Sequence, residues 1–406
     1  MNYAVFTEDM KKDYTILVPT MLPVHFEMAI SVLRTYGYNA VLLKNKGEAV
    51  KNAGLKYVHN DTCYPAQVVI GQLIDAVENG GYDKNKVALL ITQTGGGCRA
   101  SNYIFLLRKA LQKAGYGFVP VLSLNVEGLD NCVKLSLPML NKLMYAVFIG
   151  DLLMCLSNQT RPYEIKKGES DSLVKEWQDK CSGLLCDKKI KYKTIKAVMT
   201  DIVKDFSHIP LEKINKPVVG IVGEIFVKFS PLGNNDLEEF LVSQNAEVRM
   251  GGLMDFLLYC IYNNVIDNIL YGVRKAKAAG SKLIYKFLVK RQNDVIDIIK
   301  QNSSFIPISS FDHTKDLAKD FIGMGVKMGE GWLLTAEIIE LIKGGAKHVI
   351  CAQPFGCLPN HIVGKGMAKR IKETYPDVNI VAIDYDAGAS RVNQENRIKL
   401  SLNNQH

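Results

Sequence analysis

Apolar runs of strand length alternate along the chain with amphipathic stretches of helix length, a pattern typical of βαβ units around a parallel sheet. In the first third of the chain, this pattern predicts strands at Tyr14–Pro19, Ala40–Lys44, Lys56–His59, Val87–Thr92 and Phe118–Leu124. The helices predicted between them are Val24–Thr35, Ala66–Glu78 and Ser101–Ala114. These elements make one complete α/β domain, which we assign to residues 1–135.

The strand signal then stops and later restarts. Residues 136–212 contain no convincing strand and are predicted to form a helical linker or insert. Beyond them, strands are predicted at Pro217–Val222, Ala246–Arg249, His348–Ala352 and Asn379–Ile383. Helices are predicted at Asn235–Ser243, Met254–Gln301, Gly331–Lys343, Val363–Thr374 and Val392–Leu402. Residues 213–406 therefore form a second domain with a helical insertion. The predicted fold class is α/β, with two Rossmann-like, doubly wound domains with parallel sheets, joined and flanked by helices.

Composition agrees with a soluble two-domain protein. The 406 residues are 48% hydrophobic and 22% charged, which excludes a disordered chain. The first 14 residues are polar, and the most apolar stretch, Val133–Leu156, is interrupted by Lys134, Lys142 and Asp151. Neither a secretory signal nor a membrane span is expected, so we predict a cytoplasmic location and no membrane partner. Thiols stay reduced there, so the nine cysteines are not expected to form structural disulfides.

Charge and motif content exclude several common functions. Fifty basic against 41 acidic residues is a small excess for this length, and no zinc-finger or RNA-binding signature is present, so nucleic acid is not an expected partner. The chain has no G-x-x-x-x-G-K-[ST] phosphate loop. The first strand is followed by PTMLPVHFE rather than by G-x-G-x-x-G, which argues against a common nicotinamide enzyme.

Three cysteines occupy equivalent positions in the predicted pattern. Cys63, Cys98 and Cys357 each follow a predicted strand and precede a helix. Ligands of open α/β sheets bind at that edge, and helix N-termini direct free N–H groups toward it. A set of thiolates on a metal would suit such a place. A single cysteine is more often a small buried hydrophobe, so position alone leaves a shared metal site and structural cysteines as equal alternatives.

Other residues near these loops are weaker candidates. The neighbouring cysteines Cys260 and Cys351, and also Cys132, form a second tier of ligands, whereas Cys155, Cys181 and Cys186 lie in the helical segment and are predicted to be structural. Close backbone approach or contact with a bound group is predicted for Gly96, Gly97, Asn360 and His361. Glu224 and Lys228 follow a strand, and both could face the site. The alternative is that Glu224 is a helix cap and Lys228 a surface lysine. No catalytic residue is assigned.

Long sequence blocks along nearly the whole chain carry a family resemblance. They are NDTCYPAQVVIGQ, QTGGGCRASNY, RPYE (161–164), VGEIFVKF, LMDFLLYC, GEGWLLTAE, QPFGCLPNHIVGKGM and IDYDAGASRVNQENRIKL. Through these blocks the chain resembles the 2-hydroxyacyl-CoA dehydratase superfamily, and within it the branch of activase-related and double-cubane cluster proteins.

The resemblance implies an oxygen-sensitive iron–sulfur cluster between two Rossmann-like domains. Its ligands would come from Cys63, Cys98, Cys260, Cys351 and Cys357, whereas Cys132 lies where no motif cysteine is expected. The cluster would be either a 4Fe–4S cubane or an 8Fe–9S double cubane, which takes about six thiolates.

The resemblance also implies a reaction type and partners. A separate ATP-hydrolysing activator with its own 4Fe–4S cluster would deliver electrons, and the chain would act as a reductase or as a 2-hydroxyacyl-CoA dehydratase. The substrate would be a small molecule or an acyl-CoA, and a homodimer is implied. Two alternatives to this function stay open. One is a non-catalytic, cluster-carrying relay or assembly partner, and the other is a metal-free two-domain small-molecule binder.

Overall fold

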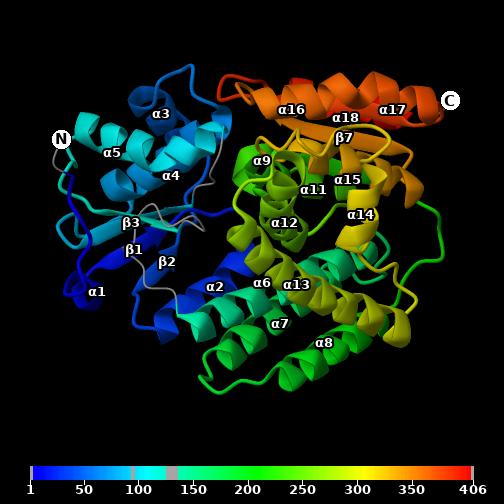
Figure 1. Ribbon diagram of the computed structural model, residues 1–406, viewed down its shortest axis with the longest axis horizontal. Helices are drawn as coiled ribbons and strands as arrows, with labels where there is room; N and C mark the ends of the chain where they lie inside the picture. The colour runs from blue at the N-terminus through cyan, green and yellow to red at the C-terminus, as the bar shows by residue number, and fades with distance from the viewer. Residues whose placement is uncertain (1–2, 93–96, 125–135, 404–406) are drawn as a thin grey trace.

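The computed structural model describes residues 3–92, 97–124 and 136–403, and these residues form two four-stranded parallel sheets with helices packed around them (Figure 1). The first sheet has the order β2-β1-β3-β4 and the second β6-β5-β7-β8. The strands are β1 (Thr15–Val18), β2 (Ala40–Leu42), β3 (Val87–Thr92), β4 (Val121–Leu124), β5 (Val218–Gly223), β6 (Glu247–Arg249), β7 (His348–Pro354) and β8 (Asn379–Tyr385). The α/β class with two parallel sheets flanked by helices is confirmed.

The helices are α1 (Met10–Asp13), α2 (Pro23–Thr35), α3 (Glu48–Tyr57), α4 (Tyr64–Asn79), α5 (Tyr103–Lys113), α6 (Leu137–Thr160), α7 (Glu169–Leu185), α8 (Tyr192–Ser207), α9 (Ile225–Phe229), α10 (Pro231–Asn234), α11 (Leu237–Ser243), α12 (Leu253–Tyr271), α13 (Lys275–Asn302), α14 (Phe311–Leu317), α15 (Gly331–Lys343), α16 (Leu358–Val363), α17 (Ala368–Thr374) and α18 (Arg391–Asn403). Two short 3₁₀ helices, η1 (Arg99–Asn102) and η2 (Lys365–Met367), precede α5 and α17.

In the first sheet, alternate strand residues pack on opposite faces, because side chains of a strand point to the two faces in turn. Ile16 and Val18 of β1 join a cluster with α2 and α6, whereas Leu17 joins a second cluster with α4 and α5. Both faces are therefore covered, which explains why the strands are continuous apolar runs rather than alternating ones.

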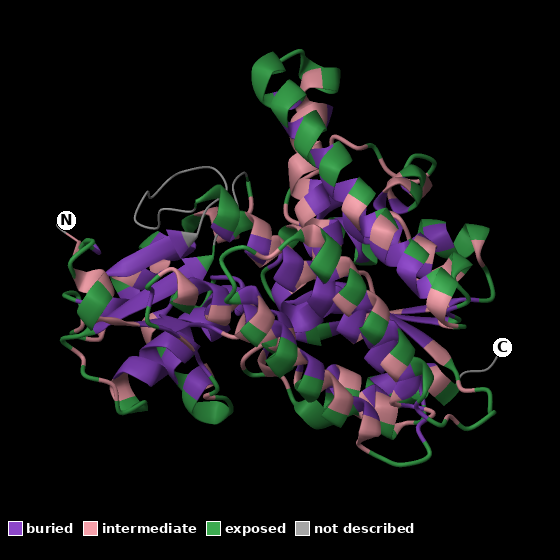
Figure 2. Ribbon diagram, turned by 90° about the horizontal axis from the view of Figure 1, so that it is seen from below, coloured by how far each residue is buried: buried purple, intermediate pink, exposed green. Residues whose placement is uncertain are grey.

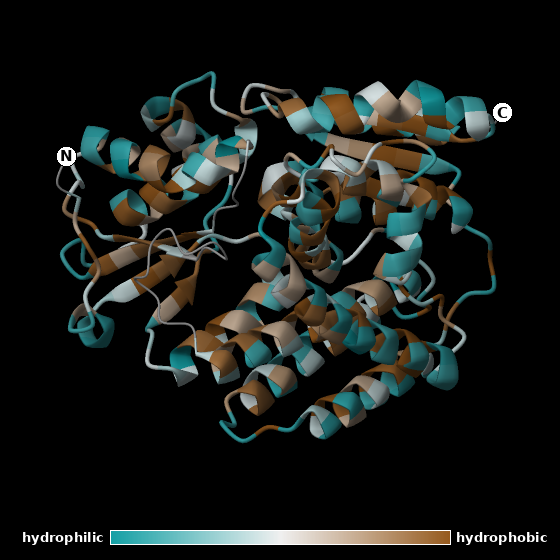
Figure 3. Cartoon of the chain, in the orientation of Figure 1, coloured by the Kyte–Doolittle hydropathy of each residue, from teal (hydrophilic) through white to brown (hydrophobic). Residues whose placement is uncertain are grey.

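The second sheet is covered in the same way. Val222 and Val349 pack beneath α15, whereas Ile221 and Ile350 face the cluster that also contains α4 and α9. One hydrophobic cluster is thus shared by the two α/β units. Figure 2 shows the strands of both sheets buried beneath partly exposed helices, and Figure 3 shows the same strands as largely hydrophobic.

Two sequence predictions within these units are wrong in detail. The strand predicted at Lys56–His59 is instead the end of α3 and the turn after it. In α3 the apolar positions Val50, Ala53 and Gly54 recur at helical spacing and are buried. A Cβ atom on Gly54 would lie 2.3 Å from the backbone oxygen of Gln67, so α3 packs backbone to backbone on α4. The long helix predicted at Met254–Gln301 is two helices, broken at Gly272, which has a φ of +68°.

A helical layer built from α6, α7, α8, α12 and α13 packs around the same buried cluster as Ile16 and Val18 of β1. By length and composition α6 is long and apolar enough to span a membrane, but 61% of the relevant window is buried inside the fold. Its charged residues have partners within the protein: Lys142 donates to the Leu185 carbonyl at 2.8 Å, and Asp151 contacts His25 at 2.9 Å. These contacts are those of a core helix.

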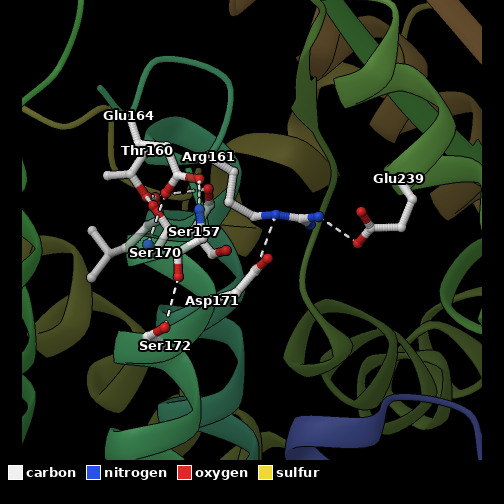
Figure 4. Close-up of polar contacts among 10 residues, drawn as sticks. Ser157, Thr160, Arg161, Glu164, Ser170, Asp171, Ser172 and Glu239 are labelled. Carbon is white, nitrogen blue, oxygen red and sulfur yellow. Dashed lines mark hydrogen bonds and ion pairs between the residues drawn. The ribbon is translucent and has the colours of Figure 1, made fainter. Parts of the chain in front are cut away.

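The RPYE block connects the helical layer to the second sheet. The Glu164 carboxylate accepts hydrogen bonds from the N–H groups of Gly168 and Ser170, at 2.6 and 2.8 Å, at the start of α7 (Figure 4). Burial raises the pKa of Glu164, but these hydrogen bonds outweigh it and the pKa is lowered. Tyr163 donates to Glu247 of β6 at 2.8 Å. The described contacts of Glu164 and Tyr163 are thus structural.

Candidate metal centre

Each of the three cysteines that the sequence predicts as possible metal ligands lies immediately before a helix. Cys63 precedes α4, Cys98 precedes η1 and Cys357 precedes α16. The loop of Cys98 leaves β3 and that of Cys357 leaves β7, as predicted, whereas Cys63 follows α3 rather than a strand. The Sγ atom of Cys98 accepts a hydrogen bond from the N–H of Ala100 at 3.5 Å.

The loops of Cys63 and Cys357 touch although they belong to different α/β units. The N–H of Tyr64 donates to the Phe355 carbonyl at 3.0 Å. Gly356 has a φ of +73°, and a Cβ atom there would lie 3.2 Å from the Cα atom of Cys63. Glycine at this position therefore allows both the left-handed backbone and the close approach of the two loops.

Electrostatic interactions link all three thiols. The pKa of Cys98 is raised to about 11, mainly by burial. The hydrogen bond from the Ala100 N–H lowers it, and negative charge on Glu330, Cys63 and Glu224 contributes to the rise. Burial is also the main cause that raises the pKa of Cys357, and negative charge on Glu330, Glu224 and Cys98 contributes to the rise. The structure thus brings one cysteine from each of three loops to the junction of the two units.

Sequence reasoning missed a phenol beside these thiols. The hydroxyl of Tyr103, the first residue of α5, lies 3.4 Å from the Sγ atom of Cys63, and the residue is buried. Because it lies within hydrogen-bonding distance of the sulfur, it is positioned to donate to a Cys63 thiolate. The signal in the sequence is its place in the QTGGGCRASNY block, five residues after Cys98.

Two buried carboxyl groups also lie near the cysteines. Glu224 caps α9, its Oε2 atom accepting from the Val227 N–H at 2.9 Å, so the helix-cap alternative is confirmed. Glu330 Oε1 accepts from the Ile225 N–H at 2.9 Å. Burial, and then repulsion from Glu330, raises the pKa of Glu224 to about 8. A raised pKa favours the protonated form of this carboxyl group, which can donate a hydrogen bond as well as accept one.

Lys228, the alternative surface lysine, is buried instead. Its Nζ atom lies 2.9 Å from Glu337 Oε1, and the two side chains are 4% and 7% exposed. Glu337 is one of several carboxyl groups along α15, and it interacts electrostatically with Glu330 and Asp255. The interior between α9, α12 and α15 thus holds more carboxyl groups than cations among the described residues.

Cys351 is packed in the protein core. It is inside β7, 1% exposed, in the hydrophobic cluster beneath α15. Its Sγ atom donates to Asn360 Oδ1 at 3.4 Å, and burial raises its pKa to about 12. A Cβ atom on Gly364 would lie 2.9 Å from this sulfur, so the thiol is packed on that side.

The remaining candidates are placed as follows. Cys260 is partly exposed on α12, next to Tyr259, which interacts electrostatically with Cys98. His361 Nδ1 lies 2.9 Å from Gln353 Nε2 of β7. The N–H of Gly97 donates to Met328 Sδ at 3.1 Å, which joins the Cys98 loop to the segment before α15. Gly96 and Cys132 lie outside the described residues.

Three thiols and the groups around them make up the donor set of this candidate centre. Within the described part of the chain, no group of three or more His, Cys, Asp or Glu side chains is arranged to hold one metal ion. Thiolates of a polynuclear cluster bind different iron atoms, so they need not converge on one point. Three thiols with helix N–H groups and buried donors around them suit such a cluster chemically. Comparisons with protein-family models and with curated proteins give no match to this chain.

Proposed function

We propose that the chain is an iron–sulfur protein whose cysteine-ligated cluster accepts electrons at low potential. The observation that supports this most directly is the meeting of Cys63, Cys98 and Cys357 from three loops at the junction of two parallel sheets. Buried thiols with raised pKa values are poor ligands until a metal displaces their protons, and metal binding supplies that driving force. The resemblance to the 2-hydroxyacyl-CoA dehydratase superfamily supports the same assignment.

The protein's own residues would hold and tune such a group. Cys63, Cys98 and Cys357 would be its ligands, and the N-terminal end of α4, with 16 residues, would favour negative charge next to Cys63. Tyr103 would donate a hydrogen bond to the Cys63 sulfur. When bound, the cluster would supply a one-electron store for reduction.

The number of converging thiols favours the smaller cluster. A 4Fe–4S cubane has four ligands, so three thiolates would leave one position for Cys260 or for a group from outside the protein. An 8Fe–9S double cubane, with about six thiolates, would also need Cys351, which is packed in the core. We therefore favour 4Fe–4S over the double cubane.

The proposed reaction requires partners. Electrons would come from a separate ATP-hydrolysing activator with its own 4Fe–4S cluster, and the chain, as a homodimer, would reduce a small molecule or dehydrate a 2-hydroxyacyl-CoA. A non-catalytic electron relay is the second candidate. Substrate-dependent turnover with the activator present distinguishes the two, because a relay transfers electrons without consuming a substrate.

The first experiment is iron and acid-labile sulfide analysis of anaerobically purified protein, with an EPR spectrum after dithionite reduction. About four of each per chain supports the cubane, and about eight iron with nine sulfide supports the double cubane. Protein that contains no iron after anaerobic reconstitution refutes the proposal and leaves the metal-free binder.

Variants test the ligand assignment. Cys63→Ala and Cys98→Ala should each lose iron while keeping the circular dichroism spectrum of the parent. Cys181→Ala, in the buried core, and Cys186→Ala, on the surface, are the matched controls and should keep full iron content. Equal iron in all four variants would contradict the assignment.

A further inference from the structure

The helices α12 and α13 pack as a hairpin whose tip, around Gly272, projects from the body of the molecule (Figure 2). This hairpin tip, residues 269–287, is rich in exposed apolar side chains. Of the 23 large hydrophobic side chains that are exposed among the described residues, seven lie in these 19 positions. They are Ile269, Leu270, Tyr271, Val273, Leu283, Ile284 and Phe287. Single exposed hydrophobic side chains are ordinary, but a group of this size marks an interaction surface.

In this segment α13 has two apolar faces. One is buried in the protein and includes Tyr285 and Leu288, three residues apart. The other carries Leu283, Ile284 and Phe287, which are 71%, 52% and 44% exposed. Leu283 and Phe287 are four residues apart and therefore share one side of the helix. A surface helix of a globular protein has one apolar face toward the core and a polar face toward water, so the second apolar face indicates a partner outside the fold.

The same part of the chain is strongly basic. Residues 272–293 contain seven basic side chains and no acidic one. The basic residues are Arg274, Lys275, Lys277, Lys282, Lys286, Lys290 and Arg291, and all five lysines are exposed. Lys282 and Lys286, four residues apart, form a row between the buried and the exposed apolar faces of α13. A partner that covers the exposed face therefore carries negative charge.

Three observations favour a lipid surface as this partner. The same face of a second copy would bring lysines against lysines, and like charges across an interface repel. Protein interfaces are enriched in arginine and depleted in lysine. Here five of the seven basic residues are lysines, and Arg291 is held over the Tyr192 ring at 3.4 Å. Lysine extends its charge from an apolar stem, which suits a boundary between acyl chains and phosphates. A projecting tip can also reach a flat surface (Figure 2).

We propose that the hairpin tip binds the surface of a membrane that contains anionic lipids. The helix α13 lies along the surface, with Leu283, Ile284 and Phe287 at the boundary between headgroups and acyl chains and the lysines at the level of the phosphates. Tyr271, 62% exposed, adds a ring of the kind that favours this boundary. The expectation that the protein has no membrane partner rests on the lack of a span, and a peripheral contact needs none.

The test is flotation of the full-length protein with vesicles of three parts phosphatidylcholine and one part phosphatidylglycerol, compared with vesicles of phosphatidylcholine alone. The protein should float with the anionic vesicles and bind the neutral ones at least about tenfold more weakly. Salt at about 1 M should release most of the bound protein, because the Debye length is then about 3 Å. Equal binding to the two kinds of vesicle overturns the proposal. Binding to neither also overturns it, and leaves an acidic protein as the occupant of the hairpin tip.

A double variant tests the charges. Lys282→Gln combined with Lys286→Gln should weaken binding to the anionic vesicles about 30-fold, the effect expected when two basic residues leave an anionic surface. The matched control is Lys188→Gln combined with Lys189→Gln, two exposed lysines in the turn between α7 and α8, and it should change the affinity less than twofold. Equal losses in the two double variants would mean that net charge alone drives binding and would refute the site.

Single variants test the apolar face. Leu283→Gln should weaken binding about tenfold, whereas Leu400→Gln, at a leucine of similar exposure on α18, should change it less than twofold. In Leu283→Trp, tryptophan emission should shift to shorter wavelength when anionic vesicles are added, and in Leu400→Trp it should not. An unchanged emission of Leu283→Trp refutes insertion of this face. Iron-free and iron-loaded protein should bind alike, so a failure of the iron–sulfur proposal leaves this result unaffected.

Discussion

Replacing Lys228 by methionine tests the buried charge balance between α9 and α15. At 2.9 Å and an effective dielectric constant of about 20, the attraction between Lys228 and Glu337 is about 6 kcal/mol, most of which offsets the desolvation of the two groups. Removing one partner leaves the other charge buried, so Lys228→Met should lower the free energy of unfolding by about 3–5 kcal/mol at pH 8.5.

The loss should be smaller at low pH, because the buried carboxyl groups around Lys228 can then take up protons. The positive charge of Lys228 lowers the already raised pKa values of Asp255, Glu330 and Glu340, so its removal should raise these folded-state pKa values further. A carboxyl with a raised folded pKa destabilises the protein as pH increases through that pKa. The loss at pH 5.5 should therefore be at least about 1.4 kcal/mol smaller than at pH 8.5.

Urea denaturation followed by tryptophan fluorescence measures both values, since Trp332 is buried on α15. Lys175→Met is the control. Lys175 is 64% exposed and pairs with Asp179 on the surface, so its loss should cost no more than about 1 kcal/mol. Equal losses for Lys228→Met at the two pH values, or a loss no larger than that of the control, would refute the reasoning.

Three further predictions concern stability. Gly54→Ala should lower the free energy of unfolding, measured by urea denaturation, by about 1–3 kcal/mol, because its Cβ would lie 2.3 Å from the Gln67 backbone oxygen. Gly183→Ala is the control and should stabilise the protein slightly, because Gly183 lies in open space on α7. Equal effects of the two variants would contradict the packing of α3 on α4. Burial, and then Glu337, raises the pKa of Asp255 to about 8, so this carboxyl makes wild type lose stability as pH rises from about 4 to 8. Asp255→Asn should reduce that slope, and parallel stability profiles of the two proteins would show the shift to be absent. Glu164→Ala should lower the free energy of unfolding by about 1–3 kcal/mol and with it the melting temperature, because two N–H groups at the start of α7 lose their acceptor. An unchanged melting temperature would contradict this prediction.

Much of the fold could be predicted because the local signal and the tertiary environment agree. Val87–Thr92 and Gly331–Lys343 begin and end as predicted, since each has a continuous or helically spaced apolar pattern and is buried. The prediction failed at Lys56–His59, a short segment in which Tyr57 and Val58 resembled the centre of a strand. The packing of Gly54 against α4 decides that region, and this contact is not visible in local sequence.

The site could be predicted only in part, because its chemistry depends on contacts distant in sequence. In the sequence, Lys228 resembles an ordinary surface lysine. Its ion-pair partner Glu337 lies 109 residues later, and only the fold brings the two side chains together. The role of such a side chain therefore depends on its partner and its burial, and residue type alone does not predict either of them.

The cysteines show what position along a strand can and cannot decide. Cys351 and Cys357 are six residues apart, and by sequence both are candidate ligands. The strand β7 continues to Pro354, so Cys351 alternates with Ile350 and Ala352 and faces the cluster beneath α15. Cys357 lies beyond the strand end, where the backbone turns at Gly356 toward the loop of Cys63. A cysteine inside a central strand has its direction fixed by the pleat, whereas one in the following loop is free to meet cysteines from other loops. Whether a cysteine lies inside a strand or beyond its end is therefore a better guide to its role, as a core thiol or as a candidate ligand, than the spacing between the cysteines.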